Sequence, residues 1–304
     1  MTTATSMSVC VIGLGSMGMG AAQSCIQAGL KTWGVDLNQQ ALQTLRDSGA
    51  QAADTCADAF AAELDAVLLL VVNAAQVKQI LFAENGLAAR LSPGTAVMVS
   101  STLSSLDAQD IEKQLNTYQL VMLDAPVSGG AAKAAKGEMT VMASGSDRAF
   151  ALLQPVLDAV AAKVYRIGSE IGQGSTVKII HQLLAGVHIA AGAEAMALAA
   201  RAGISLATLY EVVTHAAGNS WMFENRMRHV VDGDYSPTSA VDIFVKDLGL
   251  VADTAQALRF PLPLASTALN MFTAASNAGY GREDDSAVIK IFSGITLPCK
   301  QERE

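Results

Sequence analysis

Three glycines near the start of the chain have the spacing that brings a backbone close to a phosphate group. They form a G-x-G-x-x-G pattern directly after the apolar segment Val9–Ile12 and ahead of a helical stretch. In that setting the glycines permit a tight turn, close approach to a pyrophosphate and close packing of helix on strand. The helix start adds unpaired N–H groups and positive potential. We therefore predict a dinucleotide-binding turn made of Gly13, Leu14, Gly15, Ser16, Met17 and Gly18.

An acidic residue further along the chain indicates which dinucleotide binds. Asp36 closes the second predicted strand, where a carboxylate can accept hydrogen bonds from the adenosine ribose hydroxyls. Leu37 follows, at a place where an enzyme that binds a 2′-phosphate more often has arginine. Because a carboxylate also repels phosphate, the pair predicts NAD rather than NADP. The alternative is a glycine-rich turn that binds no ligand.

A second small-residue segment could bind an anion. Ser128, Gly129 and Gly130 follow another predicted strand, so they lie at the carboxyl edge of the sheet, where open α/β folds bind ligands. Ser128 can donate its hydroxyl, and the two glycines can expose successive N–H groups. The alternative is an ordinary loop.

Two lysines in helical segments are candidates for proton transfer or for contact with a ligand. Lys178 is flanked by apolar residues, and His181 lies three positions on, on the same helix face. In a desolvated pocket the pKa of a lysine falls, and the amine can then relay a proton. Lys246 precedes Asp247 in another helical segment. The alternatives are a lysine that extends to solvent and a surface ion pair.

The elements that must position these residues alternate between strands and helices in the first half of the chain. Short apolar runs predict buried strands at Ser8–Gly13, Thr32–Asp36, Asp65–Val72, Ala96–Ser100 and Val121–Ala125, with Thr140–Ser144 and Val164–Ile167 extending the sheet. Helical spacing predicts helices at Met17–Ala28, Gln39–Ser48 and Ser105–Leu115. This alternation predicts a parallel sheet of βαβ units, an α/β fold of Rossmann type.

After Gly168 the pattern becomes helical. An Ala-rich stretch without proline runs from about Gly172 to Ala202. Beyond it, helical segments are separated by the helix breakers Gly203, Pro237, Pro261 and Pro263. We therefore predict a NAD-binding Rossmann-type domain at residues 1–168, joined by one long helix to an all-helical domain at residues 169–304 for substrate binding and oligomerisation.

Composition and charge exclude several classes of partner. The net charge of −8 argues against binding of nucleic acid or anionic membranes. Met1–Ser8 does not resemble a signal peptide, and the longest uninterrupted apolar run, Ala66–Val72, is too short to span a bilayer. No histidine or cysteine has metal-binding spacing, and we predict no metal. The scattered cysteines predict reduced thiols in a cytoplasmic protein; they are Cys10, Cys25, Cys56 and Cys299.

Together and in this order, the four motifs resemble the β-hydroxyacid dehydrogenase family, which includes 3-hydroxyisobutyrate dehydrogenase and tartronate semialdehyde reductase. The resemblance implies that Lys178 is the catalytic lysine of a GxxxKxxN motif and that Asp124–Gly130, with Ser128, Gly129 and Gly130, is the substrate-binding segment. It also implies three cofactor contacts. Thr102 matches a threonine at the nicotinamide half, Lys246 matches the lysine of a KDL motif, and Asn73 follows the fourth strand of the family pattern.

One position departs from this family pattern. His181 stands where the family usually has asparagine, and with the ending Ile291–Pro298 it resembles most the branch that oxidises L-threonate. The resemblance implies NAD-dependent oxidation of a small anionic sugar acid to its 2-oxo acid, in a cleft between the domains. Lys178 would take the hydroxyl proton and His181 would hold a second hydroxyl.

Other functions on the same architecture stay open. The enzymatic alternatives are a tartronate semialdehyde reductase, a 3-hydroxyisobutyrate dehydrogenase and an imine reductase. A more distant alternative is a non-catalytic NAD(H)-binding module. The apolar, Ala-rich second half predicts a homodimer or homotetramer.

Overall fold

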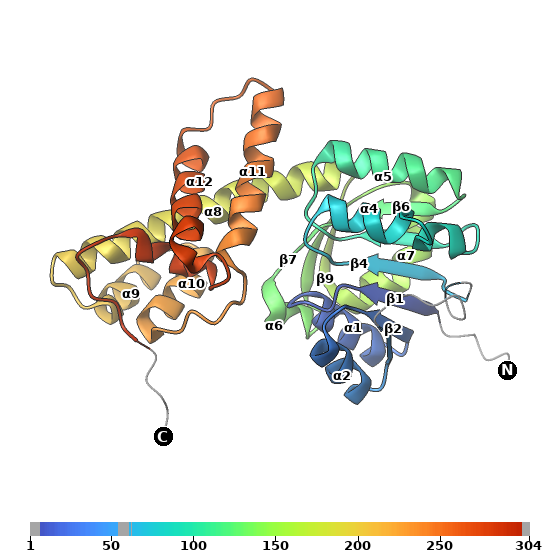
Figure 1. The fold of residues 1–304 in the computed structure, drawn as a ribbon, viewed down its shortest axis with the longest axis horizontal. Coiled ribbons are helices and arrows are strands. Elements are labelled where there is room, and N and C mark those ends of the chain that lie inside the picture. Colours follow the sequence, from blue (N-terminus) through green and yellow to red (C-terminus); the bar gives the residue numbers. More distant parts are fainter. Residues whose placement is uncertain (1–6, 54–60, 62, 300–304) are drawn as a thin grey trace. The chain divides into compact units, whose positions relative to one another are not determined.

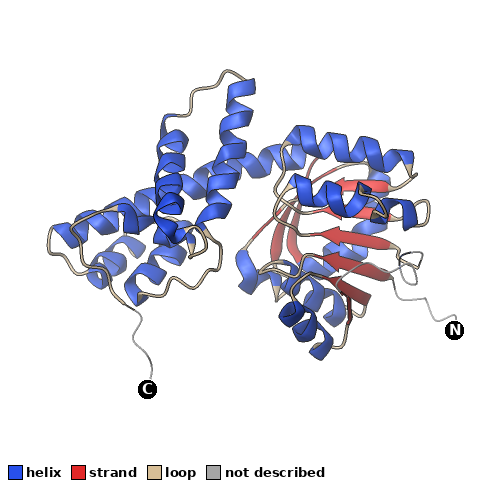
Figure 2. Cartoon of the chain, in the orientation of Figure 1, coloured by secondary structure: helices blue, strands red, loops and turns tan. Residues whose placement is uncertain are grey.

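A computed structural model describes residues 7–53, 61 and 63–299, so the predictions for Cys56 and for residues 1–6 lie outside the described part. The chain divides into two compact units, Met1–Lys178 (unit 1) and Ile179–Glu304 (unit 2). Figure 2 shows strands in unit 1 and only helices and loops in unit 2.

The described residues of unit 1 form a nine-stranded sheet, in which parallel neighbours follow the order β3-β2-β1-β4-β5-β6. Their bounds are β1 Ser8–Ile12, β2 Lys31–Val35, β3 Gln51–Ala53, β4 Ala66–Leu69, β5 Ala96–Val99 and β6 Val121–Asp124. This is the strand order of a dinucleotide-binding sheet, whose ligands bind beyond the carboxyl ends of the strands. The predicted Rossmann-type fold is therefore confirmed.

The far edge of the sheet departs from the expected parallel arrangement. It is built from β7 (Val127–Ser128), β8 (Met139–Ser144) and β9 (Ala161–Gly168). The two extra strands predicted here are present, but β8 runs antiparallel to β6 and β7 and parallel to β9. The expectation of an all-parallel sheet is wrong at this edge. Antiparallel strands need only a short connection, and β7 and β8 are joined by a single short helix, α6 (Gly130–Ala134).

Two hydrophobic cores cover the two faces of the sheet. Because successive strand residues point to opposite faces, Val9 and Val11 of β1 join one core, and Cys10 and Ile12 join the other. The first core packs against α1 (Gly18–Gln27), α2 (Gln39–Asp47) and α7 (Asp147–Val160). The second packs against α4 (Ala74–Phe82) and α5 (Ser105–Thr117). Figure 1 shows these two layers of helices.

Unit 2 is built from helices around a third core. The long helix α8 (Gln173–Arg201) enters it from unit 1, close to the predicted bounds. It is followed by α9 (Leu206–Thr214), α10 (Trp221–Asp232), α11 (Val241–Ala257) and α12 (Pro263–Ala275). Phe244 of α11 and Phe272 of α12 stack with ring centroids 5.1 Å apart in this core. In Figure 1, α11 and α12 run side by side.

Helix α8 has the length and composition that a membrane-crossing helix needs. The sequence did not indicate this, because the longest uninterrupted apolar run, Ala66–Val72, lies outside α8. Half of its most apolar stretch is buried within the protein. Ile189, Ala193 and Met196 contribute directly to the core of unit 2. A core helix accounts for this composition, so the single helix is weak evidence for a membrane span.

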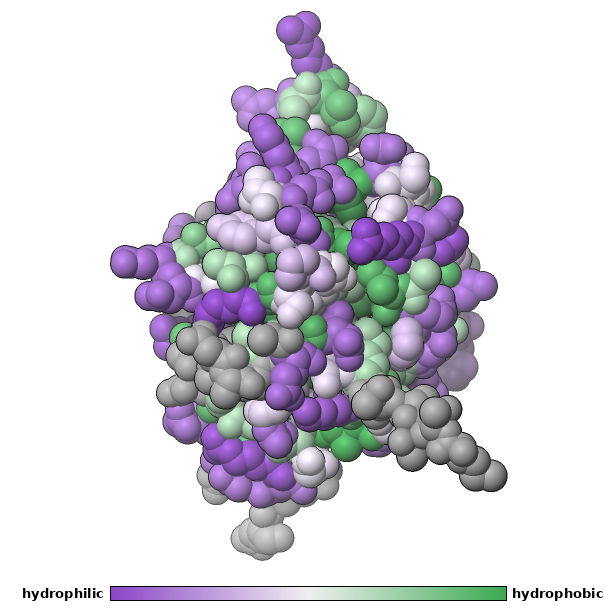
Figure 3. All heavy atoms as spheres, turned by 90° about the vertical axis from the view of Figure 1, so that its right-hand side faces the viewer, coloured by the Kyte–Doolittle hydropathy of each residue, from purple (hydrophilic) through white to green (hydrophobic). Residues whose placement is uncertain are grey.

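Exposed apolar residues lie in small groups on one face of the protein (Figure 3) and in a stripe along α8. On the face drawn in Figure 3, hydrophilic side chains predominate and hydrophobic ones lie among them in small groups, which is ordinary for a folded chain. On α8, by contrast, Ile180, Leu184 and Leu198 are each more than half exposed. Their spacing of four and fourteen residues places them on one stripe of the helix.

Candidate functional site

The glycine pattern lies in the turn between β1 and α1, and the structure requires glycine at two of its three positions. Gly13 has a φ of +91°, and a Cβ there would lie 2.6 Å from the carbonyl oxygen of Leu70. A Cβ on Gly18 would lie 1.7 Å from the carbonyl oxygen of Gly13. At Gly15 no atom lies within 4 Å of the Cβ position. This open space at the backbone is what the approach of a pyrophosphate needs.

The start of α1 offers backbone N–H groups to such a ligand. Met17, which precedes the helix, makes no side-chain capping bond, and the first turn contains no acidic residue. Leu14 is buried, while Gly15 and Ser16 are exposed. A helix start without a capping side chain favours an anion. The donor set at this turn therefore fits the diphosphate of a dinucleotide.

Asp36 follows β2 and lies beside the glycine turn. Its Oδ2 accepts a hydrogen bond from the N–H of Leu14 (2.6 Å), and its Oδ1 accepts one from the N–H of Asn38 (2.8 Å). A carboxylate has about four acceptor positions, so two are left for ribose hydroxyls. The side chain of Leu37 is 86% exposed. Neither side chain offers positive charge to a 2′-phosphate.

The loops after β4 and β5 are joined by Ser101. Its buried hydroxyl accepts a hydrogen bond from the N–H of Val71 at 3.0 Å. Thr102, half-buried, is next in the same loop. Asn73 ends the β4 loop and caps α4, because its Oδ1 accepts a hydrogen bond from the N–H of Gln76 (2.9 Å). The amide NH₂ and the second lone pair of Oδ1 are left for the predicted cofactor contact.

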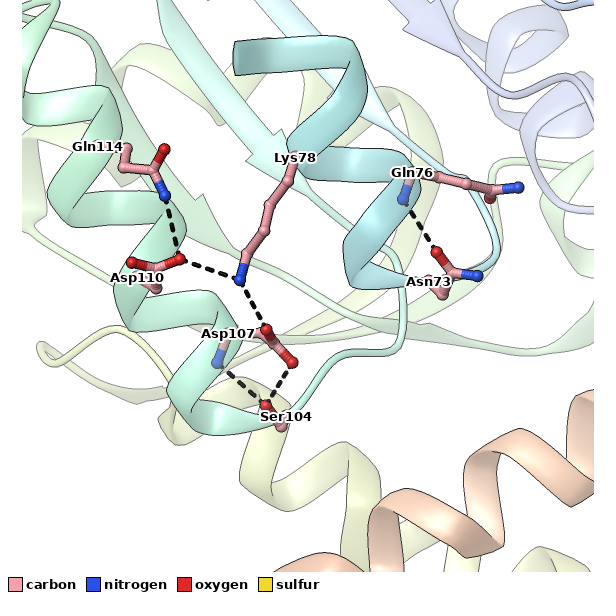
Figure 4. A network of polar contacts seen from close by, with 7 residues as sticks. All are labelled: Asn73, Gln76, Lys78, Ser104, Asp107, Asp110 and Gln114. Carbon is pink, nitrogen blue, oxygen red and sulfur yellow. Dashed lines mark hydrogen bonds and ion pairs between the residues drawn. The ribbon is translucent and has the colours of Figure 1, made fainter. Parts of the chain in front are cut away.

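Lys78 joins the two helices that follow these loops (Figure 4). Its Nζ on α4 lies 2.9 Å from carboxylate oxygens of both Asp107 and Asp110 on α5. Hydrogen bonds from Lys78 to these two groups raise the pKa of the lysine above its ordinary value. Ser104 caps α5 by accepting from the N–H of Asp107 at 3.0 Å. The starts of α4 and α5 are thereby held together, and with them the loops that carry Asn73 and Thr102.

The segment predicted to bind an anion has the backbone that this role requires. Ser128 ends β7 and pairs with Thr140 of β8. Gly129 and Gly130 have φ values of +136° and +75°, a region that side chains rarely permit. No atom lies within 4 Å of the Cβ position of Gly130. The backbone is therefore open to a ligand at Gly130, as an anion-binding turn must be, whereas a Cβ on Gly129 would lie 3.1 Å from the side chain of Lys133.

Buried Asp124, the last residue of β6, holds the first turn of α8. It accepts hydrogen bonds from the N–H groups of Gly172 (3.0 Å) and Ser175 (2.9 Å) and from the hydroxyls of Ser175 (2.7 Å) and Ser144 (3.2 Å). Burial raises the pKa of Asp124, and these hydrogen bonds oppose the shift. A carboxylate at a helix start also meets the positive end of the helix dipole.

Lys178 lies one helical turn beyond this anchor. Its side chain is only 7% exposed, so the alternative of a lysine that extends to solvent is wrong. Since the end of β6 fixes the start of α8, the strand edge also fixes where α8 presents Lys178. A lysine held in this way is suited to proton transfer at a defined position.

In unit 2, His181 and Lys246 are connected through two buried residues. Nδ1 of His181 lies 3.0 Å from Oε1 of Gln182, and Nε2 of Gln182 donates to Oδ2 of Asp247 at 2.5 Å. Nζ of Lys246 forms an ion pair with Oδ1 of Asp247 at 2.6 Å. Asp247 is 2% exposed, so the interpretation of Lys246 and Asp247 as a surface pair is wrong.

The predicted site residues are therefore divided between the two units, with His181 and Lys246 in unit 2 and the others in unit 1. The glycine turn, Asp36, Asn73 and Thr102 follow the carboxyl ends of neighbouring parallel strands, which meet at one edge of the sheet. Lys178 is anchored at the end of the next strand, β6. His181 and Lys246 belong to unit 2. Within the described residues, no cluster of three or more side chains suited to a metal occurs.

Sequence reasoning missed the residues that hold the site in place. Ser101, Gln182 and the anchoring roles of Asp124 and Asp247 depend on partners in distant segments. Asp247 did carry a signal, because it shares a helix face with the apolar residues Phe244 and Val251. An acidic residue on an apolar face predicts a buried partner.

Two family models match the chain. Residues 8–168 match the NAD binding domain of 6-phosphogluconate dehydrogenase. Residues 172–292 match the model described as NAD-binding of NADP-dependent 3-hydroxyisobutyrate dehydrogenase. The two matches account for most of both units.

Relatives of the chain match it over nearly its whole length. It is 77% identical to L-threonate dehydrogenase of Pectobacterium atrosepticum over 294 residues, which cover 97% of each chain. It is 74% identical to L-threonate dehydrogenase of Escherichia coli K12 over 298 residues, which cover 98% of this chain and 99% of the relative. The crystal structure of 3-hydroxyisobutyrate dehydrogenase from Salmonella typhimurium is 73% identical, with a TM-score of 0.91, and the match covers 94% of this chain and 100% of that one.

Proposed function

We propose that this chain, which belongs to the 3-hydroxyisobutyrate dehydrogenase-like family of NAD-dependent hydroxyacid dehydrogenases, oxidises L-threonate to its 2-oxo acid. Relatives named L-threonate dehydrogenase, at 55 to 77% identity, support this choice of substrate. The observation that carries the mechanism is the burial of Lys178 one turn beyond the Asp124 anchor.

NAD is the cofactor, and the carboxyl edge of unit 1 has the donors and acceptors to hold it. The glycine turn and the start of α1 would bind the diphosphate, and Asp36 the adenosine ribose. Thr102, Asn73 and, from unit 2, Lys246 are our candidates for the nicotinamide half. When bound, NAD supplies the acceptor for the hydride that leaves the substrate carbon.

The chain's own residues bind the acid and move its proton. The hydroxyl of Ser128 and the N–H groups of Gly129 and Gly130 bind the carboxylate. Nζ of Lys178, in its neutral form, accepts the hydroxyl proton during oxidation and returns it to the carbonyl oxygen during reduction. His181 holds a second hydroxyl, a contact that would favour a sugar acid over a simple hydroxy acid.

Replacement of the lysine tests this assignment. In Lys178→Met we expect kcat to fall by about 10²–10⁴-fold, the usual contribution of a positioned acid–base group. NADH binding, followed by fluorescence, should stay unchanged because Lys178 is not needed for the dinucleotide. The control is Lys113→Met, which removes an exposed lysine of α5. Turnover within a few-fold of the parent in Lys178→Met would remove the lysine from this role.

A second candidate substrate is 3-hydroxyisobutyrate, because a solved relative at 73% identity bears that enzyme's name. The proposed proton transfer by Lys178 would be the same for either acid. The two acids differ in what they offer to His181. L-threonate has hydroxyl groups besides the one that is oxidised, whereas 3-hydroxyisobutyrate has only the hydroxyl that is oxidised. The substrate therefore depends on what His181 binds.

We also propose that the chain forms a cytoplasmic homodimer or homotetramer that binds neither nucleic acid nor membrane. The stripe of Ile180, Leu184 and Leu198 on α8 supports assembly, because exposed apolar side chains on one helix face are suited to burial against another subunit. Light scattering should give a mass above that of one chain, and Leu184→Glu should lower it. A monomeric parent protein would refute the assembly.

A further inference from the structure

We infer that Gln182, held by Asp247, fixes His181 in the tautomer with its proton on Nδ1 and so makes Nε2 an acceptor for a substrate hydroxyl. Gln182 is then a positioning residue that determines specificity for polyhydroxy acids. The inference about specificity rests on the proposed function, whereas the tautomer follows from unit 2 alone.

The orientation of the Gln182 amide is set by its buried partner. A carboxylate that is ion-paired with Lys246 at one oxygen can only accept hydrogen bonds at the other. The Gln182 group that lies 2.5 Å from Oδ2 of Asp247 must therefore be the NH₂. This leaves the amide oxygen on the side of His181.

The amide oxygen in turn sets the position of the proton on the imidazole. Oε1 of Gln182 lies 3.0 Å from Nδ1 of His181 and can only accept a hydrogen bond. Nδ1 must therefore carry a proton, and in the neutral ring Nε2 keeps its lone pair. The neutral ring of free histidine favours the opposite tautomer, so this arrangement is imposed by the fold.

Packing keeps this chain of groups from rearranging. Gln182 and Asp247 are 7% and 2% exposed, so water has little access to replace either partner. The two helices approach closely one turn further along α8, where a Cβ on Gly186 would lie 2.9 Å from the side chain of Leu248. Leu248 is the neighbour of Asp247, so this approach brings the carboxylate within reach of Gln182.

The fixed tautomer has a consequence for substrate choice. A hydroxyl can donate to the lone pair on Nε2, whereas a second carboxylate or carbonyl oxygen has no proton to donate there. An asparagine amide at the same position could satisfy either kind of group. His181 in this state therefore selects acids that carry an additional hydroxyl, and Gln182 maintains that selection.

The tautomer can be measured without any substrate. In protein labelled with ¹⁵N-histidine, the nitrogen shifts of His181, assigned with His181→Asn, should show Nδ1–H when the ring is neutral. Gln182→Met has a similar volume but no hydrogen bonds, and it should shift the ring toward Nε2–H. The matched control is Gln154→Met, which removes an exposed amide–carboxylate bond to Asp158 on α7. An Nε2–H signal in the parent protein, or no change in Gln182→Met, would overturn the inference.

Kinetics test the effect on specificity. For L-threonate, Gln182→Met should raise KM about tenfold with kcat nearly unchanged, the size expected for one lost hydrogen bond. The 3-deoxy and 4-deoxy analogues of L-threonate each lack one hydroxyl. For the analogue that lacks the hydroxyl bound by His181, Gln182→Met should leave KM unchanged, and for the other analogue KM should rise as it does for L-threonate. An equal loss with all acids, or a loss confined to kcat, would show a merely structural role. Absence of turnover with every hydroxy acid in the parent protein would refute the proposed function, and the tautomer would still be decided by the ¹⁵N shifts.

Discussion

Asp36 is the residue that we propose decides between NAD and NADP. Its carboxylate is held beside the glycine turn because it accepts a hydrogen bond from the N–H of Leu14. The neighbouring residue, Leu37, is exposed to solvent. A 2′-phosphate needs a small hydroxyl side chain in place of Asp36 and a cationic side chain in place of Leu37. These two replacements should reverse the preference for NAD over NADP. In Asp36→Ser/Leu37→Arg we expect KM for NAD to rise and KM for NADP to fall, with a combined change of about 10- to 100-fold.

Steady-state assays with both dinucleotides measure this change. Leu37→Met is the control, since it keeps the carboxylate and an exposed apolar side chain. An unchanged ratio of the two KM values in the double variant would show that Asp36 does not contact the ribose.

The sequence was sufficient to predict the roles of some residues but not those of others. Gly13 and Gly18 were predictable because their requirement is local, a tight turn and a close helix start. Asp124 was not, because its partner Ser175 is 51 positions away and only the fold brings them together. Gln182 gave no signal at all, since its role depends on the carboxylate of Asp247 on another helix.

Among the elements, α8 and α11 carry the contact on which the His181 arrangement depends. Gly186 permits their close approach, so a larger side chain must push α11 away or distort it. We expect Gly186→Val to lower the free energy of unfolding by about 1–3 kcal/mol through overpacking. It should also weaken L-threonate binding, because Asp247 would move away from Gln182.

Thermal or denaturant unfolding measures this effect. The matched control is Gly249→Val on α11, where no atom lies within 4 Å of the Cβ position. Both variants place a β-branched residue in a helix, so their difference isolates the packing effect. Equal destabilisation in the two variants would contradict the importance of this approach.

Most elements were predictable because strand and helix periodicity is a local property. The parallel direction of β1, β2, β4, β5 and β6 followed from the alternation of apolar runs with helical segments, whereas the short strand β3 (Gln51–Ala53) was not predicted. The antiparallel direction of β8 did not, because an apolar run such as Thr140–Ser144 carries no information about strand direction. Helix α7, which contains Pro155, was not predicted.

At the scale of the whole molecule, buried Asp285 in unit 2 should make stability depend on pH. Burial raises the pKa of this carboxyl to about 7, although the Arg226 ion pair at 2.8 Å opposes the shift. Because the pKa in the folded chain is above the unfolded value of 3.8, the folded state holds its proton more tightly. The free energy of unfolding should therefore fall as pH rises through this interval, with no further loss above about pH 7.

Unfolding midpoints at about pH 5 and about pH 8, for the parent and for Asp285→Asn, test this effect. The variant is expected to be less stable throughout, because Arg226 loses its buried partner. Its pH dependence should nevertheless be smaller than that of the parent, since asparagine does not titrate. Parallel curves for the two proteins would show that Asp285 is not the responsible group.

The formation of NADH by the purified protein with a panel of acids tests the proposed function most directly. The panel contains L- and D-threonate, D- and L-erythronate, D-glycerate and 3-hydroxyisobutyrate, each with NAD⁺ and NADP⁺. We expect a clear preference for L-threonate with NAD⁺. A preference for 3-hydroxyisobutyrate or D-glycerate would contradict the substrate and the role of His181, and turnover of none of the acids by protein that binds NADH would contradict the proposed reaction.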